Sequence, residues 1–121
     1  CLPGEIPAYV IRLINRSVDA FERGAWEEVV HTTTRALDLD PQSEIALCNR
    51  AGALAHLGRL EEAMADLERA VSLNPDYGLA YNNRAWVHEL EGRIKEAVLD
   101  YEIACKLGDP HGCENLERLR R

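Results

Sequence analysis

The sequence predicts an all-α fold, an array of antiparallel helix hairpins, and three observations lead to this prediction. Alanine, leucine, glutamate and arginine are abundant while aromatic residues make up only 6% of the sequence, which favours helices over sheets. Glycine recurs with a fixed period, at Gly24, Gly58 and Gly92. Apolar residues recur at helical spacing on both sides of each glycine. A period of about 34 residues indicates one helix hairpin per repeat.

The same period is kept at several other positions. They are Trp26, Leu60 and Ile94; Ala36, Ala70 and Ala104; Asn15, Asn49 and Asn83; and Arg16, Arg50 and Arg84. Pro41 and Pro75 also keep it, and Pro110 follows one residue late. Because proline is tolerated in the first turn of a helix, these prolines are expected to separate successive hairpins.

The elements follow in order as an extended segment, three hairpins and a closing helix. The predicted boundaries are 1–9, 10–43, 44–77, 78–110 and 111–121. The two stripes of the middle hairpin are Ala46, Leu47, Arg50, Ala51 and Leu54, then Leu60, Ala63, Leu67, Ala70 and Val71. The glycine between them supplies a backbone conformation that a Cβ atom resists. Asp109 is expected to cap the last helix before Pro110, with Leu116 and Leu119 packing inward.

Residues 10–110 resemble three units of the tetratricopeptide repeat (TPR) family. The matching positions are Leu47, Ala51, Leu54, Gly58, Leu60, Ala63, Leu67, Ala70 and Pro75 in the second unit, and Tyr81, Ala85, Gly92, Ile94, Ala97, Tyr101 and Ala104 in the third. The first unit departs from the pattern, with Ser17 and Val29 where a small residue is usual. The resemblance implies a right-handed superhelical solenoid whose ends need capping.

Several function classes are disfavoured by composition and motifs. A net charge of −7 argues against binding a nucleic acid backbone, which requires clustered cations. The sequence has no phosphate-binding loop, nucleophile elbow or C-x-x-C pair, so we expect no enzyme activity, cofactor or metal site. Four histidines fall at different places in the repeat and form no shared column: His31, His56, His88 and His111.

Two cysteines near the C-terminus lie on either side of a short predicted turn. Cys105 is near the end of one helix and Cys113 near the start of the next, an arrangement similar to that of Sel1-like relatives of TPR proteins, where such cysteines form a disulfide. A bridge would contribute about 2–3 kcal/mol and imply an oxidising compartment. The alternative is a pair of buried, inert thiols, and the sequence leaves both open.

The resemblance also implies a binding surface, because the first helix of each TPR hairpin lines a concave groove. The corresponding residues are Ile11, Ile14, Asn15 and Val18; Ile45, Cys48, Asn49 and Gly52; and Leu79, Asn82, Asn83 and Trp86. The three asparagines that keep the period resemble the ladder in the TPR superhelix of O-GlcNAc transferase, and each amide can donate to and accept from a peptide backbone. Asparagine is common at this position whatever the ligand, so direct contact stays open. The implied function is a non-enzymatic adaptor that binds a segment of another protein, with Trp86 as its main anchor.

The sequence disfavours one TPR function. Co-chaperone TPR domains clamp a chaperone's C-terminal carboxylate with lysine, arginine and asparagine. The corresponding positions are Ile14, Val18, Asn49, Leu79 and Asn83. Only Asn49 matches, so the sequence predicts that this ligand is not bound.

In each repeat an arginine directly follows the periodic asparagine, and a structural role explains it better than binding does. Arg50 and Arg84 each precede an aspartate by the same separation, and a hairpin folds these acids, Asp66 and Asp100, back towards them. We therefore predict an ion pair inside each of these two hairpins. In the first unit Thr32 replaces the acid, so the arginine there, Arg16, is expected to be exposed.

Two alternative roles remain open. The chain could be an assembly module that self-associates through Ile6, Val10 and Leu13 near one end. It could also be a bacterial envelope lipoprotein that helps to assemble a larger complex, membrane-bound only if Cys1 carries a lipid. A cytosolic or organellar interior is the favoured location. The part of the partner that is bound could be the surface of a folded enzyme instead of a peptide segment.

Overall fold

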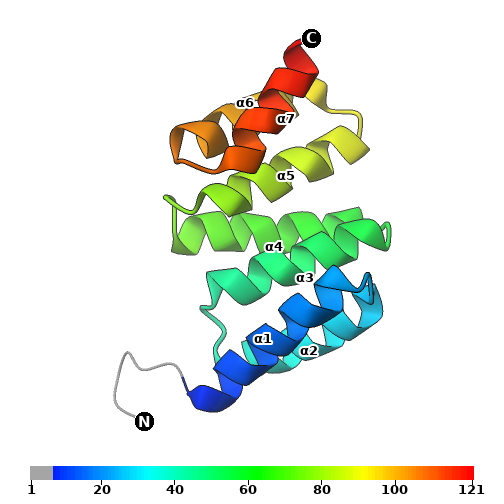
Figure 1. The fold of residues 1–121 in the computed structure, drawn as a ribbon, viewed down its shortest axis with the longest axis vertical. Coiled ribbons are helices and arrows are strands. Elements are labelled where there is room, and N and C mark those ends of the chain that lie inside the picture. Colours follow the sequence, from blue (N-terminus) through cyan, green and yellow to red (C-terminus); the bar gives the residue numbers. More distant parts are fainter. Residues whose placement is uncertain (1–6) are drawn as a thin grey trace.

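Residues 7–121 are described by the computed structural model, and they form a stack of helices along the long axis of the molecule (Figure 1). The helices are α1 (Ala8–Glu22), α2 (Trp26–Leu39), α3 (Glu44–His56), α4 (Leu60–Leu73), α5 (Gly78–Leu90), α6 (Ile94–Lys106) and α7 (Pro110–Arg120). The predicted extended segment 1–9 is too long, because α1 begins at Ala8. Cys1 and Ile6, with the lipidation and self-association predicted for them, lie outside the described residues.

Each hairpin turns at a glycine in the left-handed region of backbone space. Gly24, Gly58 and Gly92 have φ values of +73°, +81° and +79°, which confirms the conformation predicted at the break. Ser43 caps the N-terminus of α3, where its side chain accepts a hydrogen bond from the backbone N–H of Ala46 at 3.2 Å. The repeat of local signals therefore produces a repeat of local structure.

The helices form two unequal layers. Along the inner layer α1 contacts α3, α3 contacts α5, and α5 contacts α7. Within the described part of the chain, no Cα atom of α2 lies within 8 Å of α4, and none of α4 within 8 Å of α6. Because the inner helices touch and the outer helices splay apart, the array is curved, with α1, α3, α5 and α7 on its concave side. The predicted all-α array of hairpins is confirmed.

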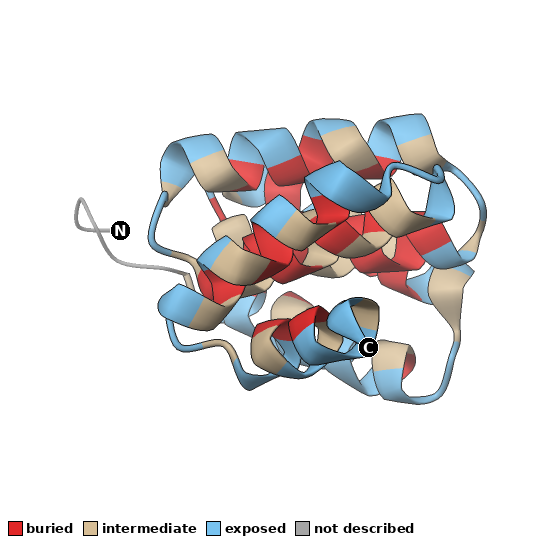
Figure 2. Ribbon diagram, turned by 90° about the horizontal axis from the view of Figure 1, so that it is seen from above, coloured by how far each residue is buried: buried red, intermediate tan, exposed pale blue. Residues whose placement is uncertain are grey.

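The core lies between the layers, where the buried bands of successive helices face each other (Figure 2). Small side chains dominate it. The fully buried alanines are Ala20, Ala36, Ala46, Ala51, Ala53, Ala63, Ala70, Ala80, Ala85, Ala97 and Ala104. Larger residues fill the remaining space, including Leu67 and Tyr101. Val10 and Leu13 are 0% and 2% exposed, so these members of the predicted self-association surface are core residues, and that prediction was wrong for them.

Both predicted ion pairs are present. Asp66 accepts two hydrogen bonds of 2.8 Å from the guanidinium of Arg50, and Asp100 accepts bonds of 2.8 and 2.9 Å from Arg84. These bonds raise the pKa of both arginines. Arg16 is exposed, as expected where the acid is missing. The pairs join the two helices of a hairpin at its inside, so they fix the geometry within each unit.

The last helix, α7, closes the array against α5 and α6. Cys105 and Cys113 form a disulfide across the turn between α6 and α7, with their Cα atoms 4.6 Å apart. Gly112 lies against α6 so closely that an added Cβ would be 2.6 Å from the Cβ of Ala104. Asp109 occupies the N-cap position as expected, but its side chain makes no capping hydrogen bond.

A polar contact also ties α7 to the rest of the array. Arg118 and Tyr101 both donate hydrogen bonds to Glu89 of α5. Burial alone would raise the pKa of Glu89, but these two hydrogen bonds lower it below its ordinary value.

The described helices include none that is both long and apolar enough to cross a membrane. Among the same residues, no cluster of three or more histidine, cysteine, aspartate or glutamate side chains is arranged to hold a metal ion.

Candidate functional site

The concave side presents one apolar residue at the same position of each inner helix. Ile11 on α1 is 46% exposed and Ile45 on α3 is 44% exposed, while Leu79 on α5 is half-buried. Val18, further along α1, is 43% exposed. Exposed aliphatic side chains of this size are candidates for contact with another molecule. Together they make a row that crosses the three inner helices.

The asparagines that keep the period lie next to this row. Asn15 is exposed. Asn49 donates to the hydroxyl of Ser17 at 3.3 Å, and Asn83 donates to the carbonyl of Cys48 at 3.4 Å, so each amide nitrogen reaches the preceding inner helix. Among the described residues, the Oδ1 atoms of Asn49 and Asn83 have no hydrogen-bond partner. In Asn49 and Asn83 the amide nitrogens therefore make hydrogen bonds within the protein, and the amide oxygens can accept hydrogen bonds from a ligand.

Three predicted site residues are not available at this surface. Cys48 is fully buried, and burial is the main reason its pKa is raised to about 12. Gly52 is buried beneath Phe21, whose ring would lie 2.9 Å from an added Cβ. Asn82 is 9% exposed because α7 covers it, and its Oδ1 accepts a hydrogen bond from Asn115 at 3.0 Å. Ile14 is half-buried against the core.

An aromatic cluster adjoins Trp86, the residue that the sequence predicts as the main anchor of the groove. His56 lies 4.7 Å from Trp86 and stacks on Trp26 at 3.9 Å with ring planes 2° apart. Phe21 contacts Trp26 and His56 edge-on, at 4.9 and 6.0 Å. Burial lowers the pKa of His56, which favours the neutral ring in this stack.

Sequence reasoning missed this cluster because its members occupy different positions of the repeat. The available signal was their clustering near two of the turn glycines, Gly24 and Gly58.

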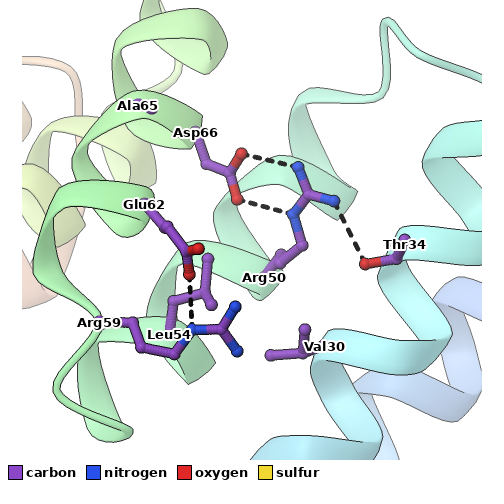
Figure 3. A pocket seen from close by; sticks show the side chains of 8 residues that line it. All are labelled: Val30, Thr34, Arg50, Leu54, Arg59, Glu62, Ala65 and Asp66. Atoms are coloured by element: carbon purple, nitrogen blue, oxygen red, sulfur yellow. Dashed lines mark hydrogen bonds and ion pairs between the residues drawn. The ribbon is translucent and has the colours of Figure 1, made fainter.

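The splayed outer helices enclose a pocket of about 330 Å³ between α2 and α4 (Figure 3). Its charged side chains are already paired with each other. Arg50 bridges Asp66 and the hydroxyl of Thr34, and Arg59 lies 2.5 Å from Glu62. With its charges internally neutralised, this pocket offers a ligand little electrostatic attraction, and the concave side is the better candidate site.

Comparisons with known proteins identify the family. Two family models, both described as tetratricopeptide repeat, match residues 45–77 and 65–111. A comparison with curated proteins gave no match.

Solved structures match over nearly the whole chain. The first TPR domain of Spaghetti (RPAP3), bound to the HSP90 peptide SRMEEVD, is 26% identical with a TM-score of 0.82, covering 93% of this chain and 90% of that one. The Sgt2 TPR domain from Aspergillus fumigatus is 25% identical with a TM-score of 0.87, covering 95% and 79%. The second TPR domain of human RPAP3, in complex with the HSP70 peptide SGPTIEEVD, is 25% identical with a TM-score of 0.80, covering 93% and 96%.

These structures overturn the exclusion of a chaperone's C-terminal carboxylate as a ligand, which was wrong. The exclusion rested on side-chain types at five positions carried over from other TPR domains. Two of the matched RPAP3 domains nevertheless hold HSP90 and HSP70 peptides on the same fold. A carboxylate also accepts hydrogen bonds from asparagine amides, and Asn49 and Asn83 each use only one of their two amide N–H groups internally, so missing lysine and arginine do not exclude such a peptide.

TPR domains of this fold thus bind peptides of partner proteins. The fixed period of the sequence, the glycine turns, the paired helix layers and the matches to family and structures all agree, and the chain belongs to the tetratricopeptide repeat family.

Proposed function

We propose that the chain is an adaptor that binds an extended peptide segment of a partner protein along its concave side and carries out no catalytic step. The contact residues are Ile11, Ile14, Asn15, Val18, Ile45, Asn49, Leu79, Asn83 and Trp86. The observation that carries the proposal is the alignment of an exposed apolar row with an asparagine row across α1, α3 and α5. Matched TPR domains that hold peptides support it.

The two rows have different tasks in this proposal. The apolar side chains supply most of the affinity by removing aliphatic surface from water. The Oδ1 atoms of Asn49 and Asn83 accept hydrogen bonds from backbone N–H groups of the peptide, at about 0.5–1.5 kcal/mol each. An extended peptide fits because its backbone N–H groups are not used internally, whereas those of a helix are.

Acidic C-terminal peptides of chaperones are the first ligands to test, given what the matched RPAP3 domains bind. Fluorescence polarisation would be measured with labelled SRMEEVD and SGPTIEEVD, each with a free and with an amidated C-terminus. A random peptide library displayed on phage would be selected in parallel. Amidation that weakens binding assigns a role to the terminal carboxylate, whereas library peptides that bind better identify another class of segment.

Variants then test the site itself. Ile45→Ala should raise the dissociation constant of the peptide by roughly three- to thirtyfold, because apolar contact is lost. The double variant Asn49→Ala/Asn83→Ala should raise it by a similar factor, because two hydrogen bonds are lost. Leu39→Ala is the matched control, because Leu39 is 53% exposed on the outer helix α2. If every peptide found binds both concave-side variants as tightly as wild type, the proposed site is refuted.

A further inference from the structure

The outer side of α6 carries an exposed apolar pair that the peptide site does not use. Leu99 is 61% exposed and Ile103, one helical turn later, is 38% exposed. The buried residues of α6, such as Ala97 and Tyr101, lie on the opposite side of the helix. Leu107 extends the pair by another turn and is also 38% exposed. The three side chains form a stripe that faces away from the array.

The other two repeats show what these positions need for folding alone. Leu99 corresponds to His31 in α2 and Ala65 in α4. Ile103 corresponds to arginine in both, Arg35 and Arg69. Since α2 and α4 fold with polar or small residues there, the hairpin itself does not require the apolar pair. Exposed apolar side chains that the fold does not require indicate a contact with another molecule.

The charges around the pair indicate which molecule. Both lysines of the sequence, Lys95 and Lys106, are exposed on α6, as is Glu96. Among the described residues none of the three makes an ion pair. Two apolar residues and two opposite charges are spaced symmetrically about Tyr101. Leu99 and Ile103 lie at equal separations on either side of it, and Glu96 and Lys106 do so further out.

A self-complementary pattern of this kind fits an antiparallel copy of the same helix. In a twofold-symmetric pair of α6 helices, Leu99 of one copy faces Ile103 of the other, and Glu96 faces Lys106. Apolar residues then meet at the centre and opposite charges meet at both ends. We propose that the chain forms a weak homodimer through α6, with Leu99 and Ile103 at the centre of the interface.

Two features set the character of this dimer. A single helix pair buries less surface than a stable protein–protein interface does, so the dimer is concentration-dependent. The concave side lies on the other layer, so both copies keep their peptide site open. An anionic membrane is a poorer occupant, because the exposed Glu96 lies next to the stripe and the whole chain carries a charge of −7.

Sedimentation velocity from micromolar to millimolar protein would test the proposal. Ile103→Arg and Leu99→Ala carry residues that other repeats already hold at these positions, so folding should be unaffected, which circular dichroism checks. We expect wild type to sediment increasingly as a dimer, and Ile103→Arg to raise the dimer dissociation constant by about tenfold or more. Leu39→Ala, also exposed but on α2, is the control and should dimerise normally.

Charge exchange tests the antiparallel register. Glu96→Lys and Lys106→Glu should each weaken the dimer, because each places like charges opposite one another across the twofold axis. The double variant restores opposite charges and should recover wild-type association. A chain that stays monomeric at millimolar concentration overturns the proposal. So does a dimer that is unaffected by these substitutions or that the double exchange does not restore.

Discussion

Replacing Asp66 with alanine tests whether the ion pairs inside the hairpins stabilise the fold. Asp66 holds the guanidinium of Arg50 by two hydrogen bonds of 2.8 Å, and their side chains are 10% and 24% exposed. In the variant, Arg50 keeps only its bond to the hydroxyl of Thr34 at 3.2 Å. A cation that was largely shielded from water would then lack its counter-charge.

The size of the effect follows from this burial. Breaking a fully buried ion pair from one side costs about 3–5 kcal/mol, whereas an exposed pair contributes about 0–1 kcal/mol. With a quarter of the Arg50 side chain open to water, part of the lost solvation is recovered. We therefore expect Asp66→Ala to lower the free energy of unfolding by about 2 kcal/mol, which for a chain of this size lowers Tm by about 6–10 °C.

Urea unfolding followed by circular dichroism in the far ultraviolet, together with a thermal melt, would measure this change. The first repeat supplies a control, because Arg16 is exposed and has Thr32 in place of the acid. Arg16→Ala should change the free energy of unfolding by less than about 0.5 kcal/mol. If Asp66→Ala unfolds at the same urea concentration and temperature as wild type, the ion pair does not stabilise the array and the reasoning fails.

Three further predictions concern the C-terminal end. Cys113→Ser removes the disulfide to Cys105 and should destabilise α7 by about 2–3 kcal/mol, which would be measured as faster amide exchange confined to that helix. Two free thiols in unreduced wild-type protein, found by alkylation and mass spectrometry, would contradict the disulfide. Gly112→Ala should also loosen α7, because its Cβ meets Ala104 at 2.6 Å, and an unchanged exchange pattern would show that the helix can shift to accept it. Glu89 has a folded pKa below its ordinary 4.5, so it contributes stability above that pH and loses it as the pH falls through the lower, folded value. Wild type should therefore lose its advantage over Glu89→Gln in urea unfolding between about pH 5 and pH 3, and a constant difference would count against the assignment.

Features that follow from local repetition could be predicted from the sequence. A turn glycine such as Gly58 needs only its own backbone conformation, and Arg50 and Asp66 meet because a hairpin of fixed length brings them together. The glycine turn occurs in all three units and the ion pair in two of them, so the copies of each pattern reinforce one another. Helix positions, the array and both ion pairs were accessible for this reason.

Contacts between residues of different units could not be predicted from the sequence. Asn82 was assigned to the concave side by its repeat position, but α7 lies across it and supplies Asn115 as a partner, a contact that no other repeat makes among the described residues. His56 joins aromatic residues from three different inner and outer helices, and no column of the repeat contains them all. The repeat predicts the average unit, and contacts between unlike units fall outside that prediction.

The separation of α2 from α4, and of α4 from α6, by more than 8 Å between Cα atoms in the described part of the chain has a mechanical consequence. Adjacent hairpins are joined by contacts between inner helices and by the contacts of α2 with α3 and of α4 with α5, whereas the outer helices in this part of the chain do not pack on one another. Bending of the stack opens or closes the outer gaps while the inner helix contacts and the ion pairs within each hairpin stay intact. Ile11, Ile45 and Leu79 lie on the inner helices, so we expect their spacing to change less than the outer gaps do, and the concave surface to keep its pitch while the convex side flexes.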